Sequence, residues 1–253
     1  MLGWSEIGQG AEATQGITIL GQERHARTLE CSNAPTLTPL AKRSHSLHNL
    51  TLDVSSCPTI RGGIFTLNLA TLLEASATSY PGKPAVIMGD SSLTYSQLNG
   101  AANQLAYALR EAGIEPGDRV AIMIPNLPYF PLCYYGILKA GATVVPLNVL
   151  LKGREVAYHL DDSEAKLLIA FEMFAQEAQQ GMAQSEHCEQ LWISTADPAG
   201  ASPVTGEGIK TLGQALHGKP PTFDTVQTMP DDTAVILYTS GTTGQPKGAE
   251  LTH

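Results

Sequence analysis

Two kinds of apolar pattern alternate along most of this chain. Short apolar runs bounded by glycine or proline are typical of strands, and longer segments with apolar residues every three to four positions are typical of helices. The runs expected to be strands are 120–124, 143–147, 166–170, 191–194 and 234–238, and the segments expected to be helices are 129–140, 155–161 and 173–180. Such alternation predicts parallel strands joined by right-handed crossovers. We therefore expect an α/β fold: a doubly wound, mostly parallel sheet with helices on both faces.

The part of the chain that precedes this alternation is expected to contain a helix, a hairpin and a long helix. Asn68 is placed to cap the first helix. The apolar residues expected on one face of that helix are Leu69, Leu72, Leu73 and Ala77. Residues 85–88 and 93–95 predict a hairpin, and Thr94 with Gln97 has the spacing of a capping box for the long helix.

A loop rich in glycine and hydroxyl groups follows the apolar run 234–238, with the sequence Thr239-Ser-Gly-Thr-Thr-Gly-Gln-Pro-Lys-Gly248. The glycines expected to allow positive φ and a close approach to a ligand are Gly241, Gly244 and Gly248. The hydroxyl donors are Thr239, Ser240, Thr242 and Thr243. Lys247 adds a positive charge behind the rigid Pro246. Together these residues predict a site for a polyphosphate.

The loop differs from the Walker phosphate-binding motif at two fixed positions. Counted from Gly241, Pro246 stands where that motif requires its second glycine. Gly248 stands where it requires a serine or threonine. An ordinary phosphate-binding NTPase is therefore disfavoured, and a glycine-rich surface turn without a ligand remains as an alternative.

The stretch from Tyr238 to Gly248, followed by Thr252-His253, resembles the signature loop of the acyl-adenylate-forming superfamily. This superfamily includes acyl-CoA synthetases, adenylation domains of peptide synthetases and luciferases. Other segments that match its pattern are Leu93-Thr-Tyr-Ser-Gln-Leu98, Gly117-Asp-Arg-Val120, Gly136-Ile-Leu-Lys-Ala-Gly141, Pro146-Leu-Asn148, Leu150-Leu-Lys152 and Glu155-Val-Ala-Tyr-His-Leu160. The resemblance runs from about residue 64 to 253 and is strongest to long-chain fatty-acid:CoA ligases.

This resemblance implies a reaction and a set of ligands. Its members join a carboxylic acid to ATP, forming an acyl-adenylate and pyrophosphate, and the ligases pass the acyl group to CoA. The implied ligands are thus ATP, magnesium, CoA and a carboxylic acid, here a fatty acid. The residues implied to hold the β- and γ-phosphates are Thr239, Ser240, Gly241, Thr242, Thr243, Gly244 and Lys247. Thr239 also corresponds to a residue near magnesium in some relatives.

The resemblance further implies that His253 begins a helix, either with a structural or acyl-site role or with no chemical role. Several family segments have no counterpart among residues 1–253: the adenine-binding Tyr-Gly-x-Thr-Glu, the ribose-binding Thr-Gly-Asp, the hinge and the domain with the catalytic lysine. We therefore expect the incomplete amino-terminal domain of an acyl-CoA synthetase-like fold. Such a chain would be inactive alone and would expose sheet edges and apolar faces.

An alternative hypothesis is a non-catalytic fragment that binds a nucleotide weakly or pairs with a homologous ligase. Acyl chain length, and the choice between CoA and a carrier protein as acceptor, are left open. Two domains are expected: a disordered leader at residues 1–62 and the truncated AMP-binding domain at 63–253. The leader is either translated without a role or is a regulatory or targeting extension.

Charge and cysteine content limit the partners and the compartment. The formal net charge of -9 argues against nucleic acid or an anionic membrane as a partner. Since Cys31, Cys57, Cys133 and Cys188 are scattered, the sequence predicts free thiols and a cytoplasmic protein. A zinc site from Cys31, His45, His48 and Cys57 would have irregular spacing. No transmembrane segment or secretory signal is expected, and a peripheral membrane contact is left open.

Overall fold

The computed structural model describes residues 67–239 and 245–253. The leader expected at residues 1–62 lies outside these residues, as does the zinc site considered for residues 31–57. Among the helices of the described residues, none is both long enough and apolar enough to cross a membrane.

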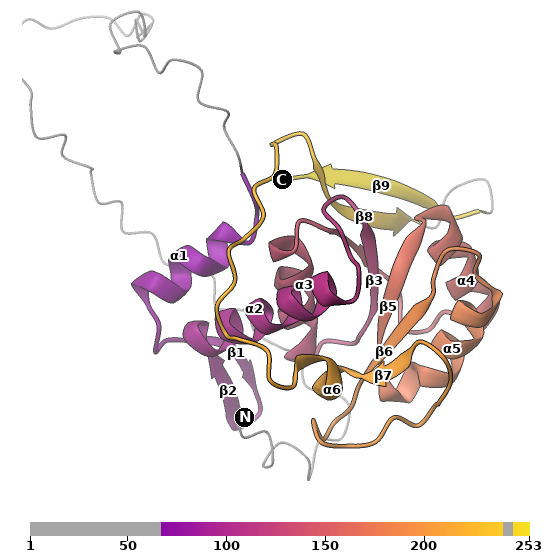
Figure 1. The fold of residues 1–253 in the computed structure, drawn as a ribbon, viewed down its shortest axis with the longest axis horizontal. Coiled ribbons are helices and arrows are strands. Elements are labelled where there is room, and N and C mark those ends of the chain that lie inside the picture. The colour runs from indigo at the N-terminus through magenta and orange to yellow at the C-terminus, as the bar shows by residue number, and fades with distance from the viewer. Residues whose placement is uncertain (1–66, 240–244) are drawn as a thin grey trace, which may run out of the picture. The chain divides into compact units, whose positions relative to one another are not determined.

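A seven-stranded sheet forms the centre of the fold (Figure 1). Its strands are β3 (Arg119–Met123), β4 (Thr143–Pro146), β5 (Ala165–Phe171), β6 (Gln190–Ser194), β7 (Ile209–Thr211), β8 (Thr233–Thr239) and β9 (Lys247–Thr252). Their order in the sheet is β7-β6-β5-β3-β4-β8-β9, and every pairing is parallel except that of β8 with β9. The first strand, β3, lies in the middle of the sheet. β4 is added on one side of it, β5, β6 and β7 on the other, and β8 then pairs with β4. The doubly wound, mostly parallel sheet expected from the sequence is confirmed.

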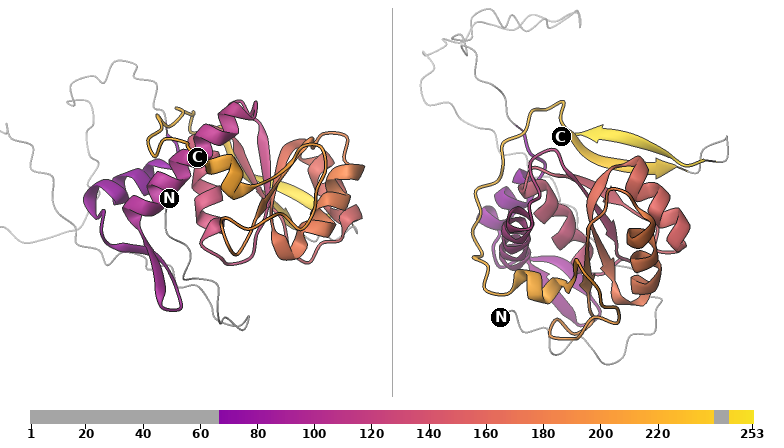
Figure 2. Two further views of the ribbon diagram at one scale, coloured as in Figure 1. Left: turned by 60° about the horizontal axis from the view of Figure 1, so that its bottom comes forward. Right: turned by 45° about the vertical axis from the view of Figure 1, so that its right-hand side comes forward.

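Helices cover both faces of this sheet, as the views in Figures 1 and 2 show. The helices are α2 (Tyr95–Glu111) and α3 (Tyr129–Lys139) on one face, and α4 (Gly153–Asp162) and α5 (Ala175–Gln184), which follows the short η2 (Glu172–Phe174), on the other. The strands read as nearly continuous apolar runs because both faces are buried. In β3, Val120 and Ile122 pack with α2 and α3, whereas Ala121 and Met123 pack with α4 and α5.

The amino-terminal segment forms the expected helix, hairpin and long helix. These are α1 (Thr71–Ser79), the antiparallel strands β1 (Pro84–Met88) and β2 (Ser91–Thr94), and α2. The capping box of α2 is confirmed, since Gln97 N donates to Thr94 Oγ1 at 3.2 Å and Thr94 N donates to Gln97 Oε1 at 2.9 Å.

The detail expected for α1 is wrong in one respect. Leu72 is 61% exposed, because the helix packs through Leu73 and Ala70 instead. α1 is assigned from Thr71 with Ala70 as its N-cap position, and the Asn68 side chain caps the turn that leads into it, since Asn68 Oδ1 accepts a hydrogen bond from Ala70 N at 2.9 Å. Asn68 is also buried, and its Nδ2 donates to the carbonyl oxygens of Leu138 at 2.7 Å and Val226 at 3.0 Å. Asn68 therefore joins the end of α3 to the segment that leads into β8.

The long connection between β6 and β8 contains two short regular elements. These are the three-residue strand β7 and the helix α6 (Leu212–Leu216) that directly follows it. After α6 the chain runs along α2, where Asn103 Nδ2 donates to Pro221 O at 2.7 Å and Gln104 Nε2 donates to Lys219 O at 2.9 Å. These bonds explain how a segment rich in glycine and proline is held against the core.

Candidate functional site

The glycine- and hydroxyl-rich loop lies at the carboxyl edge of the parallel strands. β8 runs parallel to β4, with Val235 opposite Val144, so Thr239 ends β8 at the edge where β4 also ends. β9 then returns antiparallel to β8. In open α/β sheets, ligands bind outside the carboxyl ends of the strands. The fold therefore places the candidate phosphate loop where such sheets bind ligands.

Two of the expected phosphate-binding residues, Thr239 and Lys247, face each other at the mouth of the hairpin. Thr239 is the last residue of β8 and Lys247 the first of β9, and they are directly opposite in the ladder. Side chains opposite each other lie on one face, with Cβ atoms about 5 Å apart. Both are exposed, and within the described residues Lys247 has no ion-pair partner. A hydroxyl and an ammonium group can thus reach the same anion.

The other expected phosphate-binding residues are Ser240, Gly241, Thr242, Thr243 and Gly244. All of these lie outside the described residues, between the two strands whose ends are described. Their proposed role therefore stays a prediction.

β9 was not expected from the sequence, which predicted a loop there and a helix starting at His253. All of its residues are exposed, so no buried apolar pattern marks the segment as a strand. The strand forms because β8 offers a free backbone edge for antiparallel pairing. In β8, Ala234 and Val235 are buried, whereas Leu237 is 41% exposed.

Gly248 was expected to allow positive φ, but this residue does not adopt it. It lies within β9 and does not belong to the glycines with positive φ. A Cβ atom on Gly248 would instead lie 2.8 Å from Ile236 Cγ2 and 3.3 Å from Tyr238 Cζ. Glycine is needed here because side chains of β8 occupy the space beside the backbone of β9.

The two limbs of the hairpin, next to the loop, are both hydrogen-bonded to α4. The Tyr158 hydroxyl donates to the carbonyl oxygen of Pro246 at 3.0 Å, and the Tyr238 hydroxyl donates to Asp162 Oδ2 at 2.6 Å. The rings of His159 and Tyr238 also pack, with centroids 4.4 Å apart. Burial and the adjacent Asp162 carboxylate raise the pKa of Tyr238, so its hydroxyl stays a donor. Sequence reasoning missed these contacts, because the spacing of Tyr158 and Asp162 on one helix does not reveal a partner.

His253 follows β9 and lies beside the start of α1. Its Nδ1 accepts a hydrogen bond from the backbone N of Leu69 at 3.1 Å, and its own backbone N donates to Asp232 O at 3.2 Å. Burial lowers the pKa of the imidazole, against the opposing effect of Asp232. The structural role expected for His253 thus has a specific contact.

Within the part of the chain that the structure describes, Asp161, Asp162 and the thiols of Cys133 and Cys188 form no second site. Asp161 accepts hydrogen bonds from Ser185 Oγ and Glu186 N, whereas Asp162 accepts from Tyr238, so the neighbouring carboxylates point to different partners. Cys133 and Cys188 are buried, and burial raises the pKa of both thiols, that of Cys188 to about 12. Residues 67–239 and 245–253 contain no group of three or more His, Cys, Asp or Glu side chains suited to a metal ion.

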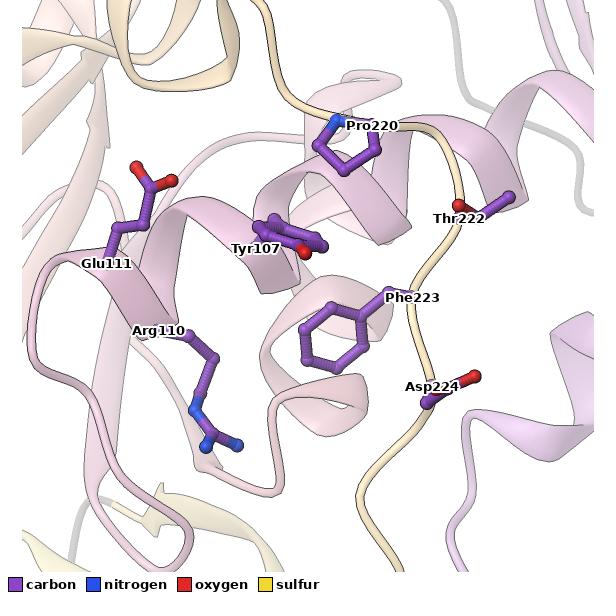
Figure 3. A pocket seen from close by; sticks show the side chains of 7 residues that line it. All are labelled: Tyr107, Arg110, Glu111, Pro220, Thr222, Phe223 and Asp224. Atoms are coloured by element: carbon purple, nitrogen blue, oxygen red, sulfur yellow. The ribbon is translucent and has the colours of Figure 1, made fainter.

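A surface hollow lies between α2 and the segment that follows α6 (Figure 3). The residues that line it are Tyr107, Arg110, Glu111, Pro220, Thr222, Phe223 and Asp224. The Tyr107 and Phe223 rings meet edge to face, and Glu111 is paired with Lys219. Because Arg110 is accompanied by two acidic residues, the hollow has no excess positive charge for a polyphosphate. None of these residues belongs to β8, β9 or α4.

Comparison with known proteins yields a matching family model and similar curated sequences. Residues 73–253 match the model described as AMP-binding enzyme. The chain is 36% identical over 189 residues to long-chain-fatty-acid–CoA ligase FadD13 of Mycobacterium tuberculosis, covering 74% of this chain and 35% of that protein. It is 34% identical over 196 residues to crotonobetaine/carnitine–CoA ligase of Escherichia coli, covering 74% and 36%. The chain therefore spans about a third of the length of these relatives.

Solved structures give the same result. The anthranilate CoA ligase AuaEII in complex with anthranoyl-AMP matches with a TM-score of 0.68 at 28% identity, covering 74% of this chain and 35% of that one. A fatty acyl CoA synthetase of Mycobacterium tuberculosis matches with a TM-score of 0.59 at 31% identity, covering 74% and 34%. The family model matches well over half of the sequence, and the fold is similar to that of solved CoA ligases. The chain belongs to the AMP-binding enzyme family.

Proposed function

We propose that this chain provides the triphosphate-binding part of an ATP-dependent carboxylic acid:CoA ligase that works through an acyl-adenylate. The observation that carries the proposal is the facing pair of Thr239 and Lys247 at the mouth of the hairpin loop. The loop lies at the edge of the sheet where α/β folds bind nucleotides. Its composition and the family membership support the same assignment.

The described residues fit the phosphates of ATP. The exposed Lys247 ammonium would offset charge on the β- and γ-phosphates, and each charge-assisted hydrogen bond contributes roughly 1.5 to 3 kcal/mol. Magnesium binds oxygen ligands, and the Thr239 hydroxyl oxygen is of that kind. It would lie beside the bound phosphates. Bound ATP supplies the adenylyl group and the pyrophosphate leaving group. The hairpin's part in this chemistry is to hold the triphosphate in one orientation.

We propose a fatty acid as the carboxylic acid and CoA as the acceptor. The ordered segments that resemble long-chain fatty-acid:CoA ligases support this choice, as does the similarity to FadD13. Other relatives of similar identity have names that specify crotonobetaine, carnitine or hydroxybenzoate, so a direct comparison of acids is needed. The proposed location is the cytoplasm.

We propose that this chain alone forms no acyl-CoA, which makes complementation the decisive experiment. The carboxy-terminal two thirds of a long-chain relative would be supplied in trans with ATP, magnesium, CoA and palmitate, benzoate or carnitine. Acyl-CoA formed only by the mixture, and most from palmitate, is the expected result. At low ATP concentration Lys247→Ala should strongly reduce it, whereas Lys83→Ala, a change of an exposed lysine outside the loop, should not. A folded mixture that binds ATP but stays inactive would count against the ligase assignment.

A second candidate function is non-catalytic: the chain binds a nucleotide weakly or pairs with a homologous ligase. The exposed edge strand β9 favours it, because Leu237 and Leu251 are 41% and 48% exposed on the hairpin. Unpaired strand edges are sites where another chain can add a strand. Sedimentation of the chain with and without a full-length relative tests this candidate, since pairing predicts a stable mixed species and its absence would count against pairing.

A further inference from the structure

We propose that Tyr158 and Asp162 on α4 are positioning residues that hold the two limbs of the hairpin and so fix the opening of the phosphate loop. The inference rests on the proposed function, since it concerns the same loop. Neither residue is expected to contact the nucleotide. Each is expected to act through the residue that it binds on β8 or just before β9.

The two contacts lie next to the two residues that face the phosphates. Tyr238, whose hydroxyl donates to Asp162 at 2.6 Å, directly precedes Thr239. Pro246, whose carbonyl accepts from Tyr158 at 3.0 Å, directly precedes Lys247. One contact therefore fixes each limb, one residue away from the groups proposed to bind the ligand. A change in either contact alters the separation of Thr239 and Lys247 before it alters anything more distant.

α4 can serve as the fixed support because it is anchored along its length. Tyr158 and Asp162 are four residues apart, so they lie on one face of the helix. Its inner face buries Val156 and Leu160 completely in the core formed with α5. The first turn is held by Glu177, whose carboxylate accepts a hydrogen bond from Gly153 N at 2.7 Å.

β9 has little such anchoring. Every residue of β9 is exposed, and its described backbone pairing is with β8 alone. β8 pairs with β4 at Val235, so the part of the hairpin beyond that pair has two strands, and such a ribbon bends easily unless side chains hold it against the core. Binding a triphosphate to a loose loop requires that the loop first be ordered, which weakens affinity. Contacts that hold both limbs in place before the ligand binds reduce this loss of affinity.

The test compares Tyr158→Phe and Asp162→Ala with matched controls that remove the same groups elsewhere. Tyr107→Phe removes a half-exposed tyrosine hydroxyl of α2, and Asp231→Ala removes an exposed carboxylate next to β8. The readouts are amide hydrogen exchange at residues 238–239 and 247–248 in the ligand-free chain, and affinity for ATP and for inorganic tripolyphosphate. The loss of one hydrogen bond predicts roughly three- to tenfold faster exchange there, with unchanged exchange in β3 and β5.

The same variants should weaken ATP and tripolyphosphate by one common factor of roughly three to ten, because only the phosphate loop is altered. The thermal midpoint should stay close to that of the controls, which separates positioning from general stability. Exchange at the hairpin ends that is equal in Tyr158→Phe, Asp162→Ala and the controls would overturn the inference. If the unaltered chain bound neither ligand, the proposed function would fail, and the exchange data would still decide whether α4 holds the hairpin.

Discussion

The imidazole Nδ1 of His253 accepts a hydrogen bond from the backbone N of Leu69 at 3.1 Å, which joins the end of β9 to the residues just before α1. The two residues are separated by nearly the whole length of the described chain. The contact requires an unprotonated Nδ1, because a protonated ring nitrogen has no lone pair to accept with.

This contact predicts a fall in stability on acidification. Burial lowers the pKa of His253 from its usual 6.5, so the unfolded chain binds the proton more readily than the folded one. The contribution is therefore complete above pH 6.5 and declines as the pH falls through the lowered pKa. His253→Asn, which keeps an acceptor near the Nδ1 position but cannot titrate in this range, should lose this decline.

Denaturant unfolding at pH 7.5 and 5.5 measures this effect. His253→Ala should lower the free energy of unfolding by about 1 kcal/mol at pH 7.5, and His253→Asn by less. His217→Ala, which removes a histidine just after α6, is the control and should keep the pH dependence of the unaltered chain. The same decline in His253→Asn as in the unaltered chain would show that another group titrates.

Gly248 should tolerate no side chain, for a steric reason. In Gly248→Ala the new Cβ would meet Ile236 Cγ2 at 2.8 Å, and overpacking of this kind reduces stability by about 1 to 3 kcal/mol. The second change Ile236→Leu removes the Cγ2 methyl and should recover part of the loss. Gly82→Ala is the control, since nothing lies within 4 Å of the added atom. Equal unfolding free energies for Gly248→Ala and Gly82→Ala would contradict the prediction.

The alternation of strand and helix patterns was enough to predict the architecture, because burial on both faces leaves a strong apolar signal in β3, β5 and β6. The α2 capping box could be predicted because its partners are three residues apart. β9 could not be predicted, since an exposed edge strand carries no such signal and exists only through its pairing with β8. The order of the strands also depends on pairings between distant segments.

The difference between local patterns and contacts of distant segments also explains which features of the candidate site could be predicted. The loop's composition indicated a polyphosphate, and Thr239 and Lys247 do lie face to face. The bonds from Tyr158 to Pro246 and from Tyr238 to Asp162 span 88 and 76 positions, and no local pattern encodes them. Gly248 does not adopt the positive φ that glycine would allow there, and its need for glycine comes from the neighbouring strand.

Lys247 should matter for nucleotide binding and not for stability. Its side chain is exposed and has no ion-pair partner among the described residues, so Lys247→Ala should leave the thermal midpoint unchanged. Loss of one charge-assisted bond to phosphate predicts roughly ten- to hundredfold weaker ATP binding. Calorimetric titration at low and high salt is the measurement, with Lys83→Ala as the matched control. ATP affinity that is the same in Lys247→Ala and Lys83→Ala would remove Lys247 from the site.

The ion pair of Lys139 with Glu74 joins α3 to α1, and Thr225 Oγ1 also donates to the Glu74 carboxylate. The side chain of Lys139 is wholly buried, whereas that of Glu74 is 35% exposed. Burial lowers the pKa of Lys139. For Glu74, burial acts in the opposite direction, but the bonds from Lys139 and Thr225 outweigh it and lower the pKa. The stability that Glu74 contributes is therefore present above about pH 4.5 and is lost as the pH falls through the lowered pKa.

The unequal burial predicts unequal effects of single changes at this pair. Glu74→Gln leaves a buried ammonium without its carboxylate and should lower the free energy of unfolding by about 3 kcal/mol. Lys139→Met leaves a carboxylate that water can reach, so its effect should be smaller, about 1 kcal/mol. The double variant should lie closer to the unaltered chain than Glu74→Gln does, because no charge remains in the core. Denaturant unfolding of all four proteins at pH 7 tests this order, and a larger loss for Lys139→Met than for Glu74→Gln would show that the carboxylate is the more deeply desolvated partner.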